Sequence, residues 1–131
     1  MQYGHFDDQN REYVIDRVDL PCSWTNYLGV EDMAAVVNHT AGGYLFYKTP
    51  EYHRISRFRS NAIPMDRPGF YVYIRDNETN DYWSISWQPV GKPLADARYS
   101  CRHGMSYTVY ECEYQDLKAS QTMVIPRGEA V

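Results

Sequence analysis

Acidic residues are the first candidates for chemistry in this chain. They form two pairs and one cluster, at Asp7-Asp8, at Glu31-Asp32, and at Asp76, Glu78 and Asp81. A glycosidase needs two carboxyl groups held a fixed distance apart across the bond that it cleaves. The first pair and the cluster, however, each separate two segments that favour strands, and Asp is a frequent turn residue. The pattern therefore favours turn formation over catalysis at both places.

A cysteine and a histidine two residues apart offer a second kind of chemistry. Cys101 and His103 point to the same face if their segment is a strand, as a thiol nucleophile or a metal site would require. A metal ion needs two more ligands, and His5, His39 and Cys112 have no recognised metal-binding spacing. A nucleophile needs a third group that orients its base. A packed cysteine beside a hydrogen-bonding histidine is the favoured interpretation, and we expect no metal site.

The segment HRISRFRS holds the one concentration of positive charge, at Arg54, Arg57 and Arg59. In a strand, Arg57 and Arg59 share a face. Guanidinium groups presented together suit a phosphate, a carboxylate or the neighbouring hydroxyls of a sugar. A charged edge strand that resists aggregation explains the same pattern. The residues alone leave both interpretations open.

The segments that carry these residues have the pattern of short β-strands. Alternating stretches separated by turn residues recur about every ten residues, which is typical of an all-β sandwich or barrel. Three antiparallel hairpins are expected: residues 4–6 with 11–15 across the turn at 7–10, residues 70–76 with 81–87 across the turn at 76–81, and residues 105–114 with 119–125 across the turn at 115–118.

The segment at residues 31–48 permits two structures. Met33, Ala34, Val36 and Val37 are spaced as at the start of an amphipathic helix. The turn residues at 41–43 and the strand-forming sequence YLFY that follows favour a hairpin instead.

The stretch DYWSISWQPV, residues 81–90, alternates large apolar and small polar side chains. As a strand it directs Trp83, Ile85 and Trp87 to one face, and Pro89 ends the pairing because it has no N–H. The tryptophans form either part of a core or a stacking platform for sugar rings. Closely spaced aromatic residues on a strand usually pack inward, so the core is the favoured interpretation.

Composition limits the classes of partner and compartment. The chain has 17 acidic and 13 basic residues, and a net charge of −4 opposes non-specific nucleic-acid binding. No apolar run approaches the ~20 residues that span a bilayer, so no membrane partner is expected. The polar N-terminus lacks a secretory signal, and three scattered cysteines form no disulfide framework. We therefore expect a cytoplasmic protein.

The C-terminal sequence TMVIPRGEAV leaves a strand, passes through a Pro-Arg-Gly turn and stops as if another strand were beginning. A mature domain rarely leaves a sheet edge bare in this way. We therefore expect the chain to be the first part of a longer protein, with an incomplete sandwich.

Seven motifs in order give the chain a family resemblance: YGHFDDQNREYVI, WTNYLG, TAGGYLFY, FRSNAIPMDRPG, YVYIRD, DYWSISWQPV and RHGMSYT. Together they resemble the start of glycoside hydrolase family 94, the inverting disaccharide phosphorylases, over residues 2–131. KTPEY, DRPG and DYWSISWQPV look closer to the chitobiose phosphorylases than to the cellobiose phosphorylases. The latter typically carry Asn-Asn before Val-Pro, where this chain has SNAIP at residues 60–64.

The resemblance implies that residues 1–131 are the N-terminal part of a super-sandwich, similar to galactose mutarotase. In the family this domain leads into an (α/α)6 barrel that carries the active site, and the barrel is absent from this chain. The general acid is an aspartate several hundred residues further on, so no catalytic residue is expected here. Phosphate replaces the water of an inverting glycosidase, which makes a second catalytic carboxylate unnecessary. A β-1,4-linked disaccharide and phosphate then give an α-sugar 1-phosphate without a metal or organic cofactor.

The resemblance also implies where ligands and partners bind. In the family this domain packs near the barrel mouth and at the interface of a homodimer. We expect Tyr47 to stack on the acceptor sugar, with Arg59 and Asn61 hydrogen-bonding at the same end. A stand-alone carbohydrate-binding or dimerisation module without catalysis is the alternative. The sequence does not distinguish chitobiose from cellobiose, because the contacts that would do so lie in the barrel.

Overall fold

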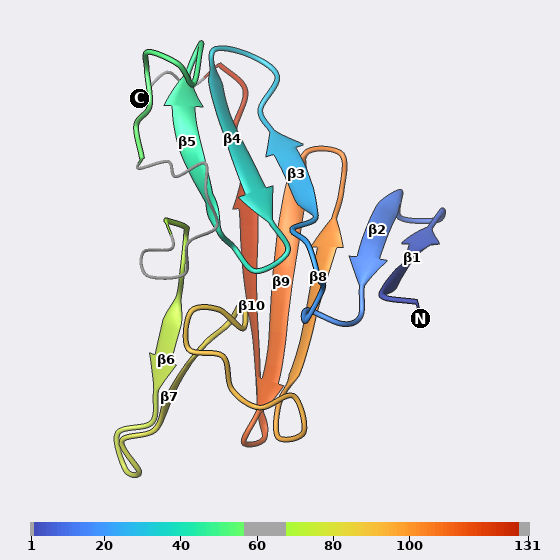
Figure 1. The fold of residues 1–131 in the computed structure, drawn as a ribbon, viewed down its shortest axis with the longest axis vertical. Coiled ribbons are helices and arrows are strands. Elements are labelled where there is room, and N and C mark those ends of the chain that lie inside the picture. The colour runs from blue at the N-terminus through green and yellow to red at the C-terminus, as the bar shows by residue number, and fades with distance from the viewer. Residues whose placement is uncertain (1, 57–67, 129–131) are drawn as a thin grey trace.

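The chain folds into two layers of antiparallel β-strands in the computed structural model, which describes residues 2–56 and 68–128 (Figure 1). One layer is a five-stranded sheet in the order β1-β2-β8-β9-β10. Its strands are β1 (Gly4–Asp7), β2 (Glu12–Ile15), β8 (Arg98–His103), β9 (Tyr107–Tyr114) and β10 (Leu117–Val124).

The other layer consists of a three-stranded sheet and a two-stranded hairpin. The sheet contains β3 (Thr25–Leu28), β4 (Met33–Asn38) and β5 (Gly43–Tyr47), and the hairpin contains β6 (Tyr73–Arg75) and β7 (Tyr82–Ser84). The prediction of an all-β antiparallel sandwich is confirmed. No helix long and apolar enough to cross a membrane occurs among the described residues.

The four predicted hairpins form, and residues 33–47 are a hairpin rather than a helix. The turn of this hairpin is shaped by the side chain of Asn38. Its Oδ1 accepts hydrogen bonds from the backbone N–H groups of Thr40 at 3.0 Å and Gly42 at 2.8 Å. Ala41 adopts a φ of 62° between them. Because the Asn38 side chain accepts hydrogen bonds from the backbone N–H groups of the turn, the chain reverses direction at this point.

The predicted turn at 115–118 is shorter in the structure. Gln115 and Asp116 both have positive φ, 49° and 62°, which is the backbone of a two-residue hairpin turn. Leu117 and Lys118 already pair with β9. The usual Asn-Gly or Asp-Gly signal for this turn is absent, and the prediction was therefore too long by two residues.

The prediction of one continuous strand over residues 81–87 is wrong. Strand β7 ends at Ser84, and Trp87 adopts a φ of 68°, which strand geometry excludes. The hydroxyl of Ser84 donates to the carbonyl of Trp87 at 2.7 Å, and that of Ser86 donates to the carbonyl of Gln88 at 3.0 Å. Hydrogen bonds from the two serine hydroxyls to nearby carbonyl groups thus replace the hydrogen bonds between strands, and the chain turns here.

The core interpretation of this stretch is confirmed. Trp83 is 3% exposed and Ile85 is 5% exposed, both within the main core cluster. Trp87 is half-buried against the same cluster, and its indole N–H donates to the carbonyl of Lys92 at 2.9 Å. The ring of Tyr114 meets Trp83 edge-on at 5.0 Å and joins the hairpin to the five-stranded sheet.

Polar contacts also join the layers. The amide nitrogen of Asn26 on β3 donates to the carbonyl oxygens of Gly104 at 2.9 Å and Tyr107 at 3.1 Å. The side-chain amide of Gln121 on β10 donates to the carbonyl of Phe70 at 2.6 Å. A second, smaller core cluster of Leu28, Ala35 and Val37 lies beneath the three-stranded sheet.

We expect Trp83→Ala to lower the free energy of unfolding by roughly 3–5 kcal/mol, because it removes a buried aromatic side chain and leaves a cavity. Tyr82→Ala is the matched control on the other face of the same strand, where the side chain is 56% exposed, and should change stability by less than about 0.5 kcal/mol. Chemical denaturation followed by circular dichroism measures both. A Trp83→Ala protein that melts normally but loses affinity for sugars would restore the platform interpretation.

Candidate functional site

Tyr47 lies at the end of β5, directly across from Met33 at the start of β4. Its hydroxyl donates to Asp32 Oδ2 at 3.0 Å, and the Lys48 ammonium lies 5.0 Å from the ring centroid. The ring of His53 approaches edge-on at 6.3 Å. The tyrosine is therefore positioned by its neighbours in a polar corner at the end of the three-stranded sheet.

The other two predicted ligand residues, Arg59 and Asn61, lie outside the described residues, as does Arg57. Arg54 is described, and its Nε donates to the carbonyl of Pro50 at 2.5 Å. It also forms an isolated bridge with Phe46 on β5. Arg54 therefore supports the loop that follows Tyr47.

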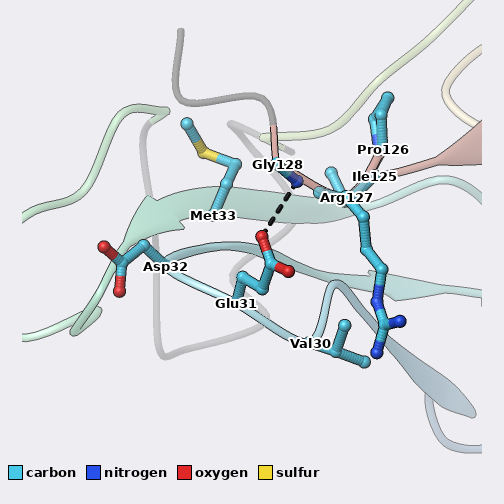
Figure 2. Close-up of a pocket in the computed structure, with 8 residues that line it drawn as sticks. All are labelled: Val30, Glu31, Asp32, Met33, Ile125, Pro126, Arg127 and Gly128. Atoms are coloured by element: carbon cyan, nitrogen blue, oxygen red, sulfur yellow. Dashed lines mark hydrogen bonds between the residues drawn. The ribbon is translucent and has the colours of Figure 1, made fainter.

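A pocket of about 390 Å³ opens beside this corner, between residues 30–33 and residues 125–128 (Figure 2). Val30, Ile125 and Pro126 supply apolar surface. The backbone N–H of Gly128 donates to Glu31 Oε2 at 2.9 Å across the pocket, as the dashed line in Figure 2 shows. The pocket is thus built by two segments that lie far apart in the sequence.

Asp32 connects the pocket to Tyr47. Asp32 is one of the residues that line the pocket, and its carboxylate, which points away from Glu31 in Figure 2, accepts the tyrosine hydroxyl and lies 3.7 Å from the Lys48 ammonium. An aromatic ring beside a carboxylate and a cation matches the hydroxyls and the apolar ring face of a sugar. The acidic pair Glu31-Asp32 is visible in the sequence, but nothing local indicates its neighbours at residues 125–128.

Two other acidic positions form turns, as predicted. Asp7 Oδ1 accepts the backbone N–H of Asn10 at 3.1 Å, and its Oδ2 accepts the side-chain amide of Asn10 at 2.7 Å. Asp76 accepts the N–H of Glu78 at 2.8 Å and the hydroxyl of Thr79 at 2.7 Å. These hydrogen bonds lower the pKa of both carboxyl groups, first through the side chains of Asn10 and Thr79 respectively. Carboxylates held ionised in this way are poor general acids.

Asp81 has a structural role between the hairpin and the five-stranded sheet. Its carboxylate pairs with the Lys92 ammonium and accepts the hydroxyl of Tyr114 at 2.8 Å and the amide of Gln115 at 3.2 Å. The hydrogen bond from Lys92, followed by that from Tyr114, lowers the pKa of Asp81. This carboxylate therefore also remains ionised and engaged.

Cys101 and His103 face inward on β8, and the thiol lies 3.8 Å from the imidazole nitrogens. Burial raises the pKa of the Cys101 thiol, so the nucleophilic thiolate is disfavoured at neutral pH. His103 Nδ1 contacts the hydroxyl of Thr108 at 3.0 Å, and its Nε2 contacts the carbonyl of Trp24 at 3.3 Å. The interpretation of a packed cysteine beside a hydrogen-bonding histidine is confirmed. Residues 2–56 and 68–128 contain no group of three or more metal-ligating side chains close enough for an ion.

A second histidine, which is buried, contacts the same segment. His39 is 5% exposed, its Nε2 lies 3.0 Å from the carbonyl of Val18, and its Nδ1 accepts the backbone N–H of Trp24 at 3.3 Å. Desolvation lowers the pKa of His39 and of His103. Neutral imidazoles on both sides therefore fix the backbone of Trp24, whose ring stacks on Tyr13 at 4.6 Å.

Sheet architecture and sequence point to one class of protein. The model of the glycosyl hydrolase 94 supersandwich domain matches residues 11–131, and the chain belongs to this family. It is similar to the N,N'-diacetylchitobiose phosphorylases of Vibrio proteolyticus and Vibrio furnissii, with 56% and 55% identity over 129 residues. Each of these matches covers 98% of this chain and 16% of the relative.

A more distant relative is the solabiose phosphorylase of Paenibacillus borealis, with 32% identity over 130 residues. That match covers 98% of this chain and 17% of the relative. The chain thus spans about one sixth of the length of the curated relatives that it matches.

His39 and His103 make the free energy of unfolding depend on pH. Their pKa values are depressed in the folded chain, so their contribution is complete above the unfolded value of about 6.5 and is lost as pH falls below it. A histidine that is protonated only in the unfolded chain adds up to about 1.4 kcal/mol per pH unit to the slope of the free energy of unfolding against pH. Urea denaturation between pH 5 and 7 measures this slope. We expect His39→Gln to reduce it, and an unchanged slope would contradict the assignment.

Proposed function

We propose that this chain is the N-terminal supersandwich part of a phosphorylase that cleaves N,N'-diacetylchitobiose with inorganic phosphate. The observation that carries the proposal is the 56% identity with a phosphorylase of that name over 98% of the chain. Identity falls to 32% and 31% for phosphorylases named for other substrates. This difference favours N,N'-diacetylchitobiose over the substrates for which those two relatives are named.

The described carboxylates support a non-catalytic role for this part of the protein. A general acid must carry its proton at the working pH, whereas Asp7, Asp76 and Asp81 all have lowered pKa values and hydrogen-bonded structural roles. We therefore assign the general acid to the remaining five sixths or so of the protein, in the helical barrel that the family resemblance implies. There it protonates the leaving oxygen while phosphate attacks with inversion, and no metal or organic cofactor is needed.

Within this proposal, the corner around Tyr47 faces the barrel and contributes to the acceptor subsite. The half-buried ring, the Asp32 carboxylate and the Lys48 ammonium supply the mixture of apolar face and hydrogen-bonding groups that a sugar requires. Arg59 and Asn61 are proposed to complete this end of the subsite. We also propose that the sandwich contributes to a homodimer and that the protein acts in the cytoplasm.

We expect the longer protein to release a sugar 1-phosphate from N,N'-diacetylchitobiose only when phosphate is present. Residues 1–131 alone should release none, because the proposal assigns the general acid to the remaining part of the protein. Incubation of both proteins with N,N'-diacetylchitobiose or cellobiose, with and without phosphate, followed by an assay for sugar 1-phosphate, tests this. Hydrolysis without phosphate by the longer protein, or turnover by residues 1–131, would contradict the proposal.

We expect Tyr47→Ala in the longer protein to raise the KM for disaccharide roughly 2- to 10-fold, matching the ~0.5–1.5 kcal/mol of an aromatic contact. The KM for phosphate should change less. Tyr47→Phe is the matched control, since it keeps the ring and removes only the hydrogen bond to Asp32. Steady-state kinetics with each substrate varied in turn measures both constants. Equal effects on the two constants, or no effect, would place Tyr47 outside the subsite.

A further inference from the structure

One imidazole joins the two ends of the segment at residues 18–24, in the loop between β2 and β3. Within the described part of the chain, positions 18–23 make no backbone–backbone hydrogen bond. His39, which directly follows β4, instead contacts the carbonyl oxygen of Val18 at 3.0 Å through Nε2 and the backbone N–H of Trp24 at 3.3 Å through Nδ1. The segment is therefore closed by a single side chain from another part of the fold.

These two contacts define the protonation state of His39. A backbone N–H can only donate, so Nδ1 must be unprotonated to accept the hydrogen bond from Trp24. A carbonyl oxygen can only accept, so Nε2 must carry the proton that is donated to Val18. The neutral tautomer with its proton on Nε2 satisfies both contacts. An imidazolium carries protons on both nitrogens, so its Nδ1–H would face the N–H of Trp24 and that hydrogen bond would be lost.

His103 does not face the same conflict. Its Nδ1 contacts the hydroxyl of Thr108 at 3.0 Å, and a hydroxyl can rotate so that it accepts a hydrogen bond instead of donating one. Its Nε2 contacts the carbonyl oxygen of Trp24 at 3.3 Å and can donate to it in both protonation states. A backbone N–H cannot become an acceptor. Protonation therefore breaks a hydrogen bond at His39 and can be accommodated at His103.

No carboxylate among the described residues stabilises a positive charge on His39. Desolvation lowers its pKa, and no charged side chain is among the causes of that shift. From β8 it is approached by His103, whose own pKa is lowered by desolvation and further by the proximity of His39. In the β2–β3 loop, Arg17 and Asp19 pair with each other at 2.6 Å. Burial raises the pKa of the Tyr110 hydroxyl on β9, which stays neutral.

We propose that His39 is a pH-sensitive switch for this segment: the neutral ring holds both ends, and protonation at Nδ1 releases the Trp24 end. Leu20 in the segment packs against the main core cluster, and the ring of Trp24 stacks on Tyr13 at 4.6 Å. Opening therefore loosens an apolar contact and an aromatic stack beside the β1–β2 hairpin. The carbonyl of Trp24 still accepts the backbone N–H of His39 at 3.0 Å, so β3 keeps its place beside β4.

The size of the response follows from the difference in protonation between the closed and open segment. Once the segment opens and water reaches the ring, an ordinary imidazole takes up a proton near pH 6.5, whereas the closed segment excludes that proton. Each pH unit below about 6.5 therefore raises the ratio of open to closed segment by up to about tenfold. Above that pH the ratio is constant, and the segment stays closed.

Hydrogen exchange at the amide of Trp24 tests the proposal in the longer protein, because His39 accepts the hydrogen bond from this N–H. After correction for the intrinsic effect of pH on exchange, we expect its protection to fall about 10-fold between pH 7.5 and pH 5.5. The amide of Cys112, on the central part of the five-stranded sheet, should keep its protection. Constant protection at Trp24 would overturn the proposal. An equal loss at Cys112 would also overturn it, because that result reports global unfolding.

His39→Gln separates the charge from the polar contacts, since the amide of glutamine can donate and accept but does not titrate. We expect the protection at Trp24 to become independent of pH in this variant. His5→Gln is the matched control, because it removes an exposed histidine that contacts Asp16, and it should keep the pH dependence of the unsubstituted protein. A pH dependence that survives in His39→Gln would overturn the proposal.

The pH profile of the unsubstituted protein decides the matter if His39→Gln fails to fold. None of these measurements depends on phosphorolysis, because the switch is inferred from contacts within this chain alone. An active phosphorylase with a constant Trp24 profile would contradict the switch and leave the proposed function in place. A protein without phosphorolysis whose Trp24 amide responds to pH would do the reverse.

Discussion

The two layers are held in place by a buried tyrosine that reaches from one sheet to the turn of the other. Tyr110 on β9 is fully buried, and its hydroxyl donates to the carbonyl of Asn38 at 2.8 Å. Burial raises the pKa of this hydroxyl, so it remains a neutral donor at physiological pH. The same Asn38 shapes the β4–β5 turn through its side chain, so one residue both closes a hairpin and fixes that hairpin on the opposite sheet.

The corner around Tyr47 depends on this arrangement. The pairing of β4 with β5 brings Asp32 beside the Tyr47 hydroxyl, and the position of this hairpin over the five-stranded sheet brings Glu31 beside the backbone of Gly128. Asp7 and Asp76 are instead held in turns, and Asp81 is held in an ion pair.

Much of this fold was predictable from local sequence. Alternation and turn residues identified the hairpins, because period-two patterning and Asp-rich turns are local properties. The end of β7 was not predictable, because Ser84 and Ser86 bind nearby carbonyls instead of continuing the ladder. The pocket between residues 30–33 and 125–128, and the histidine contacts to Trp24, were also missed, since they join segments distant in sequence. Of the three ligand residues predicted, only Tyr47 falls within the described residues, and its role remains a prediction.

The order of the strands has a consequence for how the chain acquires its structure. Strands β8, β9 and β10 follow one another directly and pair as neighbours, so their contacts close only short loops. The β1–β2 hairpin instead pairs with β8, through contacts such as Ile15 with Cys101, and most of the chain lies between them. Closing so long a loop carries a larger entropic cost and slows folding. During synthesis, the β1–β2 hairpin leaves the ribosome before β8, and it can pair with the rest of its sheet only after β8 has emerged.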